Sequence, residues 1–270
     1  MMNIENIKNE LAVRGIKAEQ VEVVKNGISC VGFQIITNSN VRPVVYYSQN
    51  ETLSSFMEKI DAAVKHLPDF NFVVLQDKDY VISNLYVTVQ RRCEQDDVLA
   101  FDYLNLEAVM RLRISLDDQE ERGSIKVSSS LLEMAGISIE DAWKAALNNM
   151  KSAISVRSMA AVLGMPEELF PAPFHIVTTE NGVDGASALL YPEIFNTFCQ
   201  QHEIGECIIL PSSTQEVLVI PDKKDGICYD DFARMVNEVN NTEVDPMIRL
   251  YPVVYRYDIV SNMIKIVAEA

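Results

Sequence analysis

Hydroxyl side chains gather between two apolar runs in the last third of the chain. Ser212, Ser213 and Thr214 follow one run, and Glu216 comes just before the next. A nucleophilic serine needs a base and an oxyanion donor beside it. The surrounding PSSTQE has no G-x-S-x-G elbow, and the chain has only 3 histidines. Because loops often carry binding residues, we expect a binding edge at this loop, and no catalytic residue.

An acidic cluster adjoins basic residues in the middle of the chain. Its members are Asp117, Asp118, Glu120 and Glu121, with Arg111, Arg113 and Arg122 close in sequence. Carboxylate oxygens are the ligands that hard divalent cations prefer. Calcium-binding loops set their ligands around a glycine where the chain turns, and DDQEERG lacks that order. The segment therefore indicates a solvated turn and no metal site.

Two other segments resemble functional motifs and favour structural roles. TTENGVDGAS lacks the lysine and the glycine spacing of a phosphate-binding loop, so Asn181 and Gly182 predict a hairpin turn and no cofactor. Tyr251, Tyr255 and Tyr257 flank a single arginine, an interleaving that can stack nucleobases. Alternation along a strand places these tyrosines on one face, which favours packing against a helix.

Cysteine usage and hydropathy bear on the compartment. The 5 cysteines are widely spaced and form no C-x-x-C pair, so we expect free thiols in a reducing environment. The amino-terminal residues lack a basic end followed by an apolar run, and no segment has about 18 consecutive apolar residues. These features predict a cytoplasmic protein with no membrane partner.

The charge balance bears on partners. The chain of 270 residues has 39 acidic and 23 basic side chains, a formal net charge of −16. An acidic surface repels phosphate backbones because both are negatively charged. It also has no excess of basic side chains to release the counterions of a nucleic acid. We therefore expect no generic nucleic-acid binding. Solubility is the simpler use of this charge, with capture of basic partners or imitation of nucleic acid as alternatives.

Periodicity predicts elements in the amino-terminal half. Apolar spacing indicates a helix over residues 4–16, and Asn26-Gly27 between β-branched runs indicates a two-residue hairpin. The later elements of this half are strands at 41–47, 80–89, 106–115 and 123–127, and helices at 51–67, 128–136 and from Ser138 to Met150. We expect Ser138 to be the N-cap of the last helix. Trp143 in the last helix is expected in the core.

The carboxy-terminal half also contains both predicted strands and predicted helices. Strands are predicted at 174–179, 186–190, 206–211, 215–221, 251–258 and 262–267, and helices at 191–202 and 229–239. In the second helix we expect Phe232, Met235, Val236 and Val239 to face inward. Hairpins interspersed with single helices predict an α+β fold of antiparallel sheets with packing helices.

Prolines interrupt the pattern between Gly164 and Pro173. This segment predicts a boundary between an amino-terminal region, residues 1–163, and a carboxy-terminal region, residues 174–270. One continuous domain is the alternative.

Several segments resemble one family over nearly the whole chain. They are KNG, VRPVVYY, VISNLYVTVQRRC, LEAVMRLRIS, GSIKVSSSLLEMAGIS, TTENGVDGASALLYPEIF, IILPSSTQEVLVIPD and MVNEVNNTEVDPMIRLYPVVYRYD. The chain is similar to the domain-of-unknown-function family numbered five-six-eight-eight, known from Firmicutes and their mobile elements. The resemblance implies a shared fold, a bacterial or phage origin and no assigned activity. Members of this family often carry extra residues between VRSMAAVLG and FHIVTT, so the resemblance implies that this chain is shorter there. Any function housed in that insertion is in doubt for this chain.

These observations predict a noncatalytic interaction or regulatory protein of a bacterium, phage or mobile element, with a protein as partner. One alternative is an enzyme of unfamiliar type centred on residues 205–222. The other is an acidic mimic of nucleic acid that acts against a host defence protein. The sequence leaves open whether a small molecule binds.

Overall fold

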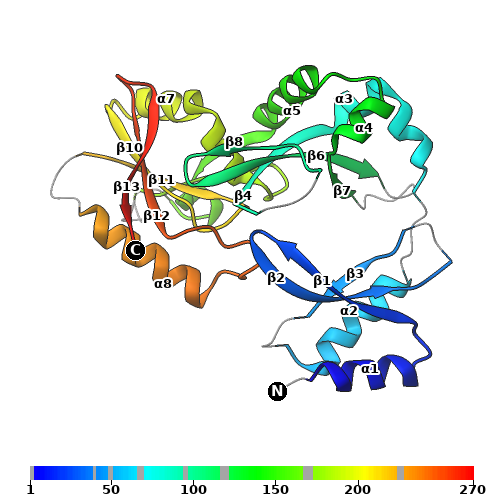
Figure 1. Cartoon of the computed structure of the whole chain (residues 1–270). Helices are drawn as coiled ribbons and strands as arrows, with labels where there is room; N and C mark the ends of the chain where they lie inside the picture. The colour runs from blue at the N-terminus through cyan, green and yellow to red at the C-terminus, as the bar shows by residue number, and fades with distance from the viewer. Residues whose placement is uncertain are drawn as a thin grey trace.

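The computed structural model describes residues 3–38, 41–47, 51–65, 70–93, 97–115, 122–166, 173–223 and 228–270. These residues form a three-stranded, a four-stranded and a six-stranded sheet, in which all strand pairs are antiparallel. Helices cover the sheets, and the amino-terminal unit lies below the other two sheets in Figure 1. The α+β prediction is confirmed.

The amino-terminal unit folds around its own core. Its elements are α1 (Ile4–Val13), β1 (Ala18–Lys25), β2 (Ile28–Ile35), β3 (Val44–Tyr46) and α2 (Leu53–Lys65). Both helices bury one face against the sheet, through residues such as Ile7, Phe56 and Ile60. The predicted hairpin is confirmed, because Lys25 pairs with Ile28 across a turn in which Asn26 and Gly27 have φ of 51° and 70°.

The middle unit carries a four-stranded sheet. It contains η1 (Phe72–Gln76), α3 (Lys78–Asn84), β4 (Leu85–Arg91), β5 (Ala100–Tyr103), β6 (Leu106–Ser115), β7 (Arg122–Lys126), α4 (Ser129–Met134) and α5 (Ile139–Ala153). β6 pairs with β4 on one side and with β5 and β7 on the other. The predicted cap of α5 is confirmed, since Asp141 N donates to Ser138 Oγ at 3.1 Å. Trp143 is partly buried and packs edge-on against Phe101.

One predicted strand of this unit is partly wrong. Residues 80–84 belong to α3, and the strand begins only at Leu85. The carboxylate of Asp77 accepts hydrogen bonds from the backbone N–H groups of Asp79 and Tyr80 at 2.9 and 3.1 Å. This cap satisfies donors at the start of the helix and outweighs the β-propensity of Tyr80 and Val81.

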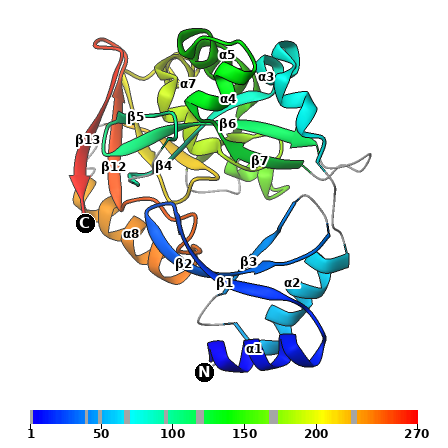
Figure 2. The same cartoon turned by 45° about the vertical axis from the view of Figure 1, so that its right-hand side comes forward.

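The carboxy-terminal unit is built on the six-stranded sheet, in the order β13-β12-β10-β11-β9-β8. Its elements are β8 (Ile154–Ser158), α6 (Met159–Val162), β9 (His175–Thr179), η3 (Gly185–Leu190), α7 (Pro192–Gln201), β10 (Glu206–Leu210), β11 (Val217–Pro221), α8 (Tyr229–Thr242), β12 (Val253–Asp258) and β13 (Met263–Glu269). Tyr255 and Tyr257 have 0% exposure in the main core, which confirms their packing role. Figure 2 shows the long β12 and β13 strands beside α8.

Two predictions in this unit are wrong. Residues 186–190 form the 3₁₀ helix η3 and not a strand, so Asn181 and Gly182 do not close a hairpin. The cause is a long-range contact: Gly185 N donates to Gln215 O at 2.9 Å, which turns the chain across the sheet.

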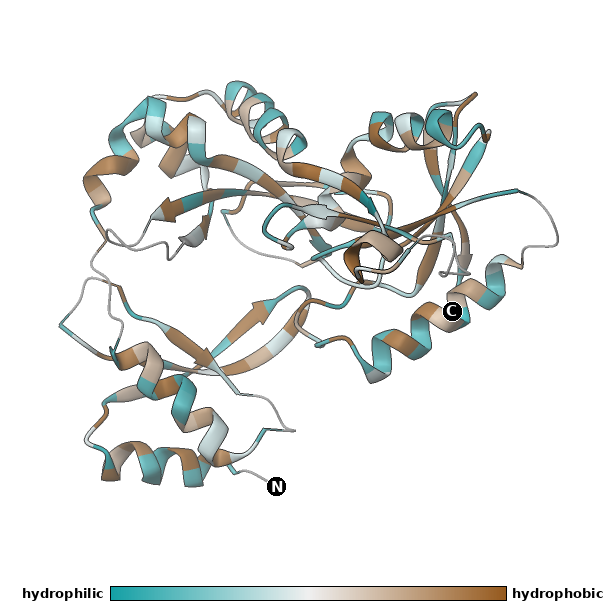
Figure 3. Cartoon of the chain, turned by 180° about the vertical axis from the view of Figure 1, so that it is seen from behind, coloured by the Kyte–Doolittle hydropathy of each residue, from teal (hydrophilic) through white to brown (hydrophobic). Residues whose placement is uncertain are grey.

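The inward face of α8 also differs from the prediction. Ala233, Val236 and Asn240 are buried, whereas Met235 and Val239 are exposed by 37% and 40%. Asn240 takes an inward position because its Nδ2 donates to Leu250 O at 3.3 Å. The surface helices carry hydrophilic and hydrophobic residues on separate faces (Figure 3).

The predicted boundary segment connects two paired strands of one sheet. β8 precedes the proline-rich segment and β9 follows it, and the two strands pair along their length. Val89 and Leu106 of the middle unit share a core with Tyr255. The division into residues 1–163 and 174–270 stays a prediction, and residues 167–172 of the boundary segment lie outside the described residues.

Cys30, Cys199, Cys207 and Cys228 are free thiols in the structure. Across the described ranges, no helix has the length and apolar character needed to cross a membrane.

Candidate functional site

The four-stranded sheet has one apolar and one polar face. Side chains alternate along its strands, so Leu112 and Ile114 of β6 enter the core beneath the helices, whereas Arg111 and Arg113 project from the other side. Tyr86 and Thr88 of β4 share the polar face, because Tyr86 pairs with Arg111 in the register. The polar face is therefore a direct consequence of the MRLRIS alternation.

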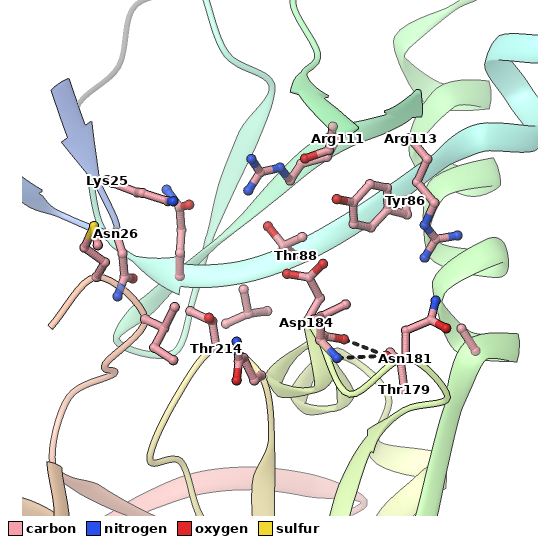
Figure 4. A pocket seen from close by; sticks show the side chains of 18 of the residues that line it. Lys25, Asn26, Tyr86, Thr88, Arg111, Arg113, Thr179, Asn181, Asp184 and Thr214 are labelled. Carbon is pink, nitrogen blue, oxygen red and sulfur yellow. Dashed lines mark hydrogen bonds between the residues drawn. The ribbon is translucent and has the colours of Figure 1, made fainter. Parts of the chain in front are cut away.

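A cleft of about 910 Å³ lies over this polar face. Its walls come from segments far apart in the sequence: the tip of the β1–β2 hairpin, strands β4 and β6, the loop 179–184, and residues near 214 and 247. Figure 4 shows Arg111 and Arg113 on the sheet, Lys25 on the hairpin, and Asp184, Asn181 and Thr214 on the opposing loops. The volume is in the usual range for small-molecule sites, roughly 300–1,000 Å³.

Asn26 fixes the hairpin tip beside the cleft. Its Nδ2 donates to Arg249 O at 2.7 Å, and its Oδ1 accepts from Arg91 N at 2.8 Å. The residue is only 4% exposed, so both bonds are sheltered from water. This docking holds Lys25, the neighbouring residue, against the wall of the cleft.

Four basic residues gather around the sheet side of the cleft. Lys25, Arg111 and Arg113 line it, and Lys126 of β7 pairs with Arg111 in the register. Arg113 lies over the Tyr86 ring, with Cζ 4.4 Å from the ring centre. Burial and then the charge of Arg111 lower the pKa of Lys126, and Lys25 adds to this effect. The site is locally basic in a protein of net charge −16.

Two polar atoms on this face lack protein partners. Thr88 Oγ1 and Arg111 Nε are buried, and neither forms a hydrogen bond within the described part of the chain. Thr88 is only 2% exposed, and both residues line the cleft. Buried polar groups are normally hydrogen-bonded, so these two atoms indicate a place where a ligand supplies the missing partner.

Asp184 faces the basic residues from the loop side. It adopts the left-handed conformation, with φ of 58°. Thr179 braces the loop, since its Oγ1 donates to Val183 O at 2.7 Å and accepts from Val183 N at 3.2 Å. Burial raises the pKa of the Asp184 carboxyl, and the charges of Arg111 and Arg113 only partly oppose this effect. Asp184 is thus a sheltered carboxyl within the electrostatic reach of both arginines.

Comparison with known families gives one match. The model of a family of unknown function, DUF5688, matches residues 2–259. The chain belongs to the DUF5688 family. The resemblance seen in the sequence is thereby confirmed, and this membership assigns no activity. Neither the curated proteins nor the solved structures gave a match to this DUF5688 chain.

The predicted binding loop contributes one residue to the cleft. Thr214 lines it, whereas Ser212, Ser213 and Glu216 do not. Ser213 is 5% exposed and its Oγ accepts a hydrogen bond from Gln215 N at 3.1 Å, which stabilises the turn. A binding role for the four residues stays a prediction.

Sequence reasoning missed most of the cleft. In the sequence, Arg111 and Arg113 stand out only as neighbours of an acidic cluster, whose residues 117, 118, 120 and 121 lie outside the described residues. Within the described ranges, no group of three or more His, Cys, Asp or Glu residues could hold a metal ion. The signal for the arginines was their alternate spacing on a strand whose other residues are apolar.

Proposed function

We propose that this chain is a noncatalytic binding protein whose cleft takes a small anionic ligand. The observation that carries the proposal is the convergence of Lys25, Arg111 and Arg113 on one cleft. Its floor holds Thr88 Oγ1, which has no hydrogen-bond partner among the described residues. Binding of an anion lowers the free energy of cations that repel one another in a partly buried site. An arginine guanidinium also matches the geometry of a planar or tetrahedral oxyanion.

The arrangement supports ligand sensing by the amino-terminal unit. That unit has its own core and contributes Lys25 and the docked Asn26 to the cleft. A ligand held between Lys25 and the β6 arginines would hold the hairpin against the sheet. We propose that the protein works in the cytoplasm and that a protein partner recognises the form in which the hairpin is held against the sheet. We propose no generic nucleic-acid binding.

Catalysis is the second candidate, and Asp184 is the observation that favours it. Burial raises the pKa of the Asp184 carboxyl, and a carboxyl with a raised pKa is suited to general acid–base catalysis. The sequence-based alternative centred on residues 205–222 shares only its central turn with the cleft. If the protein converts a bound anion to a product, the noncatalytic proposal is wrong.

An anion panel tests the proposal. At constant ionic strength, we expect inorganic phosphate, pyrophosphate or citrate to raise the melting temperature relative to chloride. A ligand at about a hundredfold its Kd adds roughly 2.7 kcal/mol, which corresponds to a rise of roughly 5 to 10 °C for a chain of this size. In Arg111→Met this rise should disappear, because the cleft loses a cation at its floor.

The matched control is Arg157→Met, which changes an exposed arginine of β8 outside the cleft. The control should keep the full response to the anions. A panel in which no anion stabilises the wild-type protein, or in which both variants respond alike, rules out the cleft as an anion site.

A further inference from the structure

The cleft has two chemically different ends. The sheet end presents cations from β1 and β6, and the loop end presents the carboxylates of Asp184 and Glu180. Figure 4 shows Arg111 and Arg113 on strand β6, and Asp184 and Asn181 on the loop that faces this strand. A ligand that fills the cleft must therefore satisfy positive groups at one end and hydrogen-bond acceptors at the other.

The sheet end fits a phosphate group. Arg111 and Arg113 are two residues apart on one strand, so their side chains leave the same face as neighbours. Lys25 approaches from the hairpin, and Lys126 adds charge behind Arg111. This is more positive charge than one carboxylate requires, and it suits a doubly charged phosphate held by guanidinium groups. The buried hydroxyl of Thr88 supplies one more hydrogen-bonding group at the floor.

The loop end of the cleft can accept hydrogen bonds from an organic group of the ligand. No side-chain hydrogen bond from Asp184 caps η3, although the residue precedes that helix directly. Its carboxyl thus has capacity to accept hydrogen bonds from hydroxyl or amino groups, and Glu180 is exposed at the rim beside it. The hydroxyl of Thr214 and the amide groups of Asn181 and Gln215 line the same region.

We propose that the ligand is a phosphate monoester whose organic part carries hydroxyl or amino groups. The phosphate binds Arg111, Arg113 and Lys25, and the organic part donates hydrogen bonds to Asp184. The inference rests on the proposed function, because it specifies the ligand of the same cleft. The cleft volume of about 910 Å³ accommodates a sugar phosphate or a nucleoside monophosphate.

Titration calorimetry with defined probes tests the inference. The probes are inorganic phosphate, ribose 5-phosphate, glucosamine 6-phosphate, adenosine 5′-monophosphate and unphosphorylated ribose. We expect at least one phosphate ester to bind about tenfold more tightly than inorganic phosphate, because the organic part adds hydrogen bonds, and ribose to show no binding. A preference for the nucleotide or for a sugar phosphate then identifies the organic part.

Two variants separate the ends of the cleft. Asp184→Asn keeps a residue type that tolerates positive φ, and should remove the advantage of the ester over inorganic phosphate while leaving phosphate binding in place. Arg111→Met should weaken phosphate and ester alike. The control Asp102→Asn removes an exposed carboxylate of β5 outside the cleft and should bind as the wild type does.

The two proposals fail in different ways. If inorganic phosphate binds through Arg111 but no ester binds more tightly, or if Asp184→Asn keeps the preference for the ester, the ligand class is wrong and the anion site stands. If neither phosphate nor any ester binds and the anion panel is also without effect, the proposed function itself is overturned.

Discussion

Changing Asn26 and Gly27 together to valine is expected to lower the free energy of unfolding by roughly 3 to 5 kcal/mol. Both residues have positive φ, which is costly for a β-branched side chain. The change also removes the buried bonds from Asn26 to Arg249 and Arg91, and a Cβ on Gly27 would lie 3.0 Å from Arg92 O. Chemical denaturation with a fluorescence or circular dichroism signal measures the loss.

Gly15→Val is the control for this change. Gly15 has φ of +69°, but nothing lies within 4 Å of a Cβ built there. The control therefore carries a backbone cost without disturbing the docking, and should lose roughly 1 to 2 kcal/mol. Equal losses in the two variants would contradict the account of Asn26 as the contact that docks the hairpin.

Gly185→Ala is expected to lower the free energy of unfolding by roughly 2 to 3 kcal/mol, as other overpacked sites do. A Cβ at this position would lie 2.5 Å from both Gln215 O and Thr178 Cα, which are backbone atoms and cannot rotate away. The loop that carries Asp184 would have to move, so phosphate-ester binding should weaken as well. Denaturation and calorimetry on the same sample measure both effects.

Gly205→Ala is the matched control, since a Cβ at Gly205 meets nothing within 4 Å. It should change stability by about 0.5 kcal/mol or less. If Gly185→Ala unfolds at the same denaturant concentration as this control, the close approach of η3 to β9 and β11 is not what shapes the loop.

Local signals in the sequence account for much of the fold. The Asn26-Gly27 turn and the Ser138 cap act within a few residues, so they predict the hairpin and α5 correctly. The Asp77 cap is also local, but the β-branched and aromatic residues after it favoured a strand. The 3₁₀ helix η3 depends on a contact between Gly185 and Gln215, which no local pattern contains.

The cleft was harder to predict, because its walls come from distant segments. Periodicity indicates that Arg111 and Arg113 share a face of β6, but not that the face looks toward the hairpin. Lys25 and Asp184 reach the cleft through the docking of Asn26 and the turn before η3. Of the four residues predicted at the hydroxyl-rich loop, Thr214 alone lines the cleft.

Arginine-edited NMR during a titration with ribose 5-phosphate tests the central claim most directly. The Nε–H signals of Arg111 and Arg113, assigned by Arg→Lys variants, should shift together and saturate with a single Kd, while that of the exposed Arg157 stays in place. If all arginine signals shift in parallel with ionic strength, or if Arg111 and Arg113 do not respond at saturating phosphate ester, the cleft is not the ligand site.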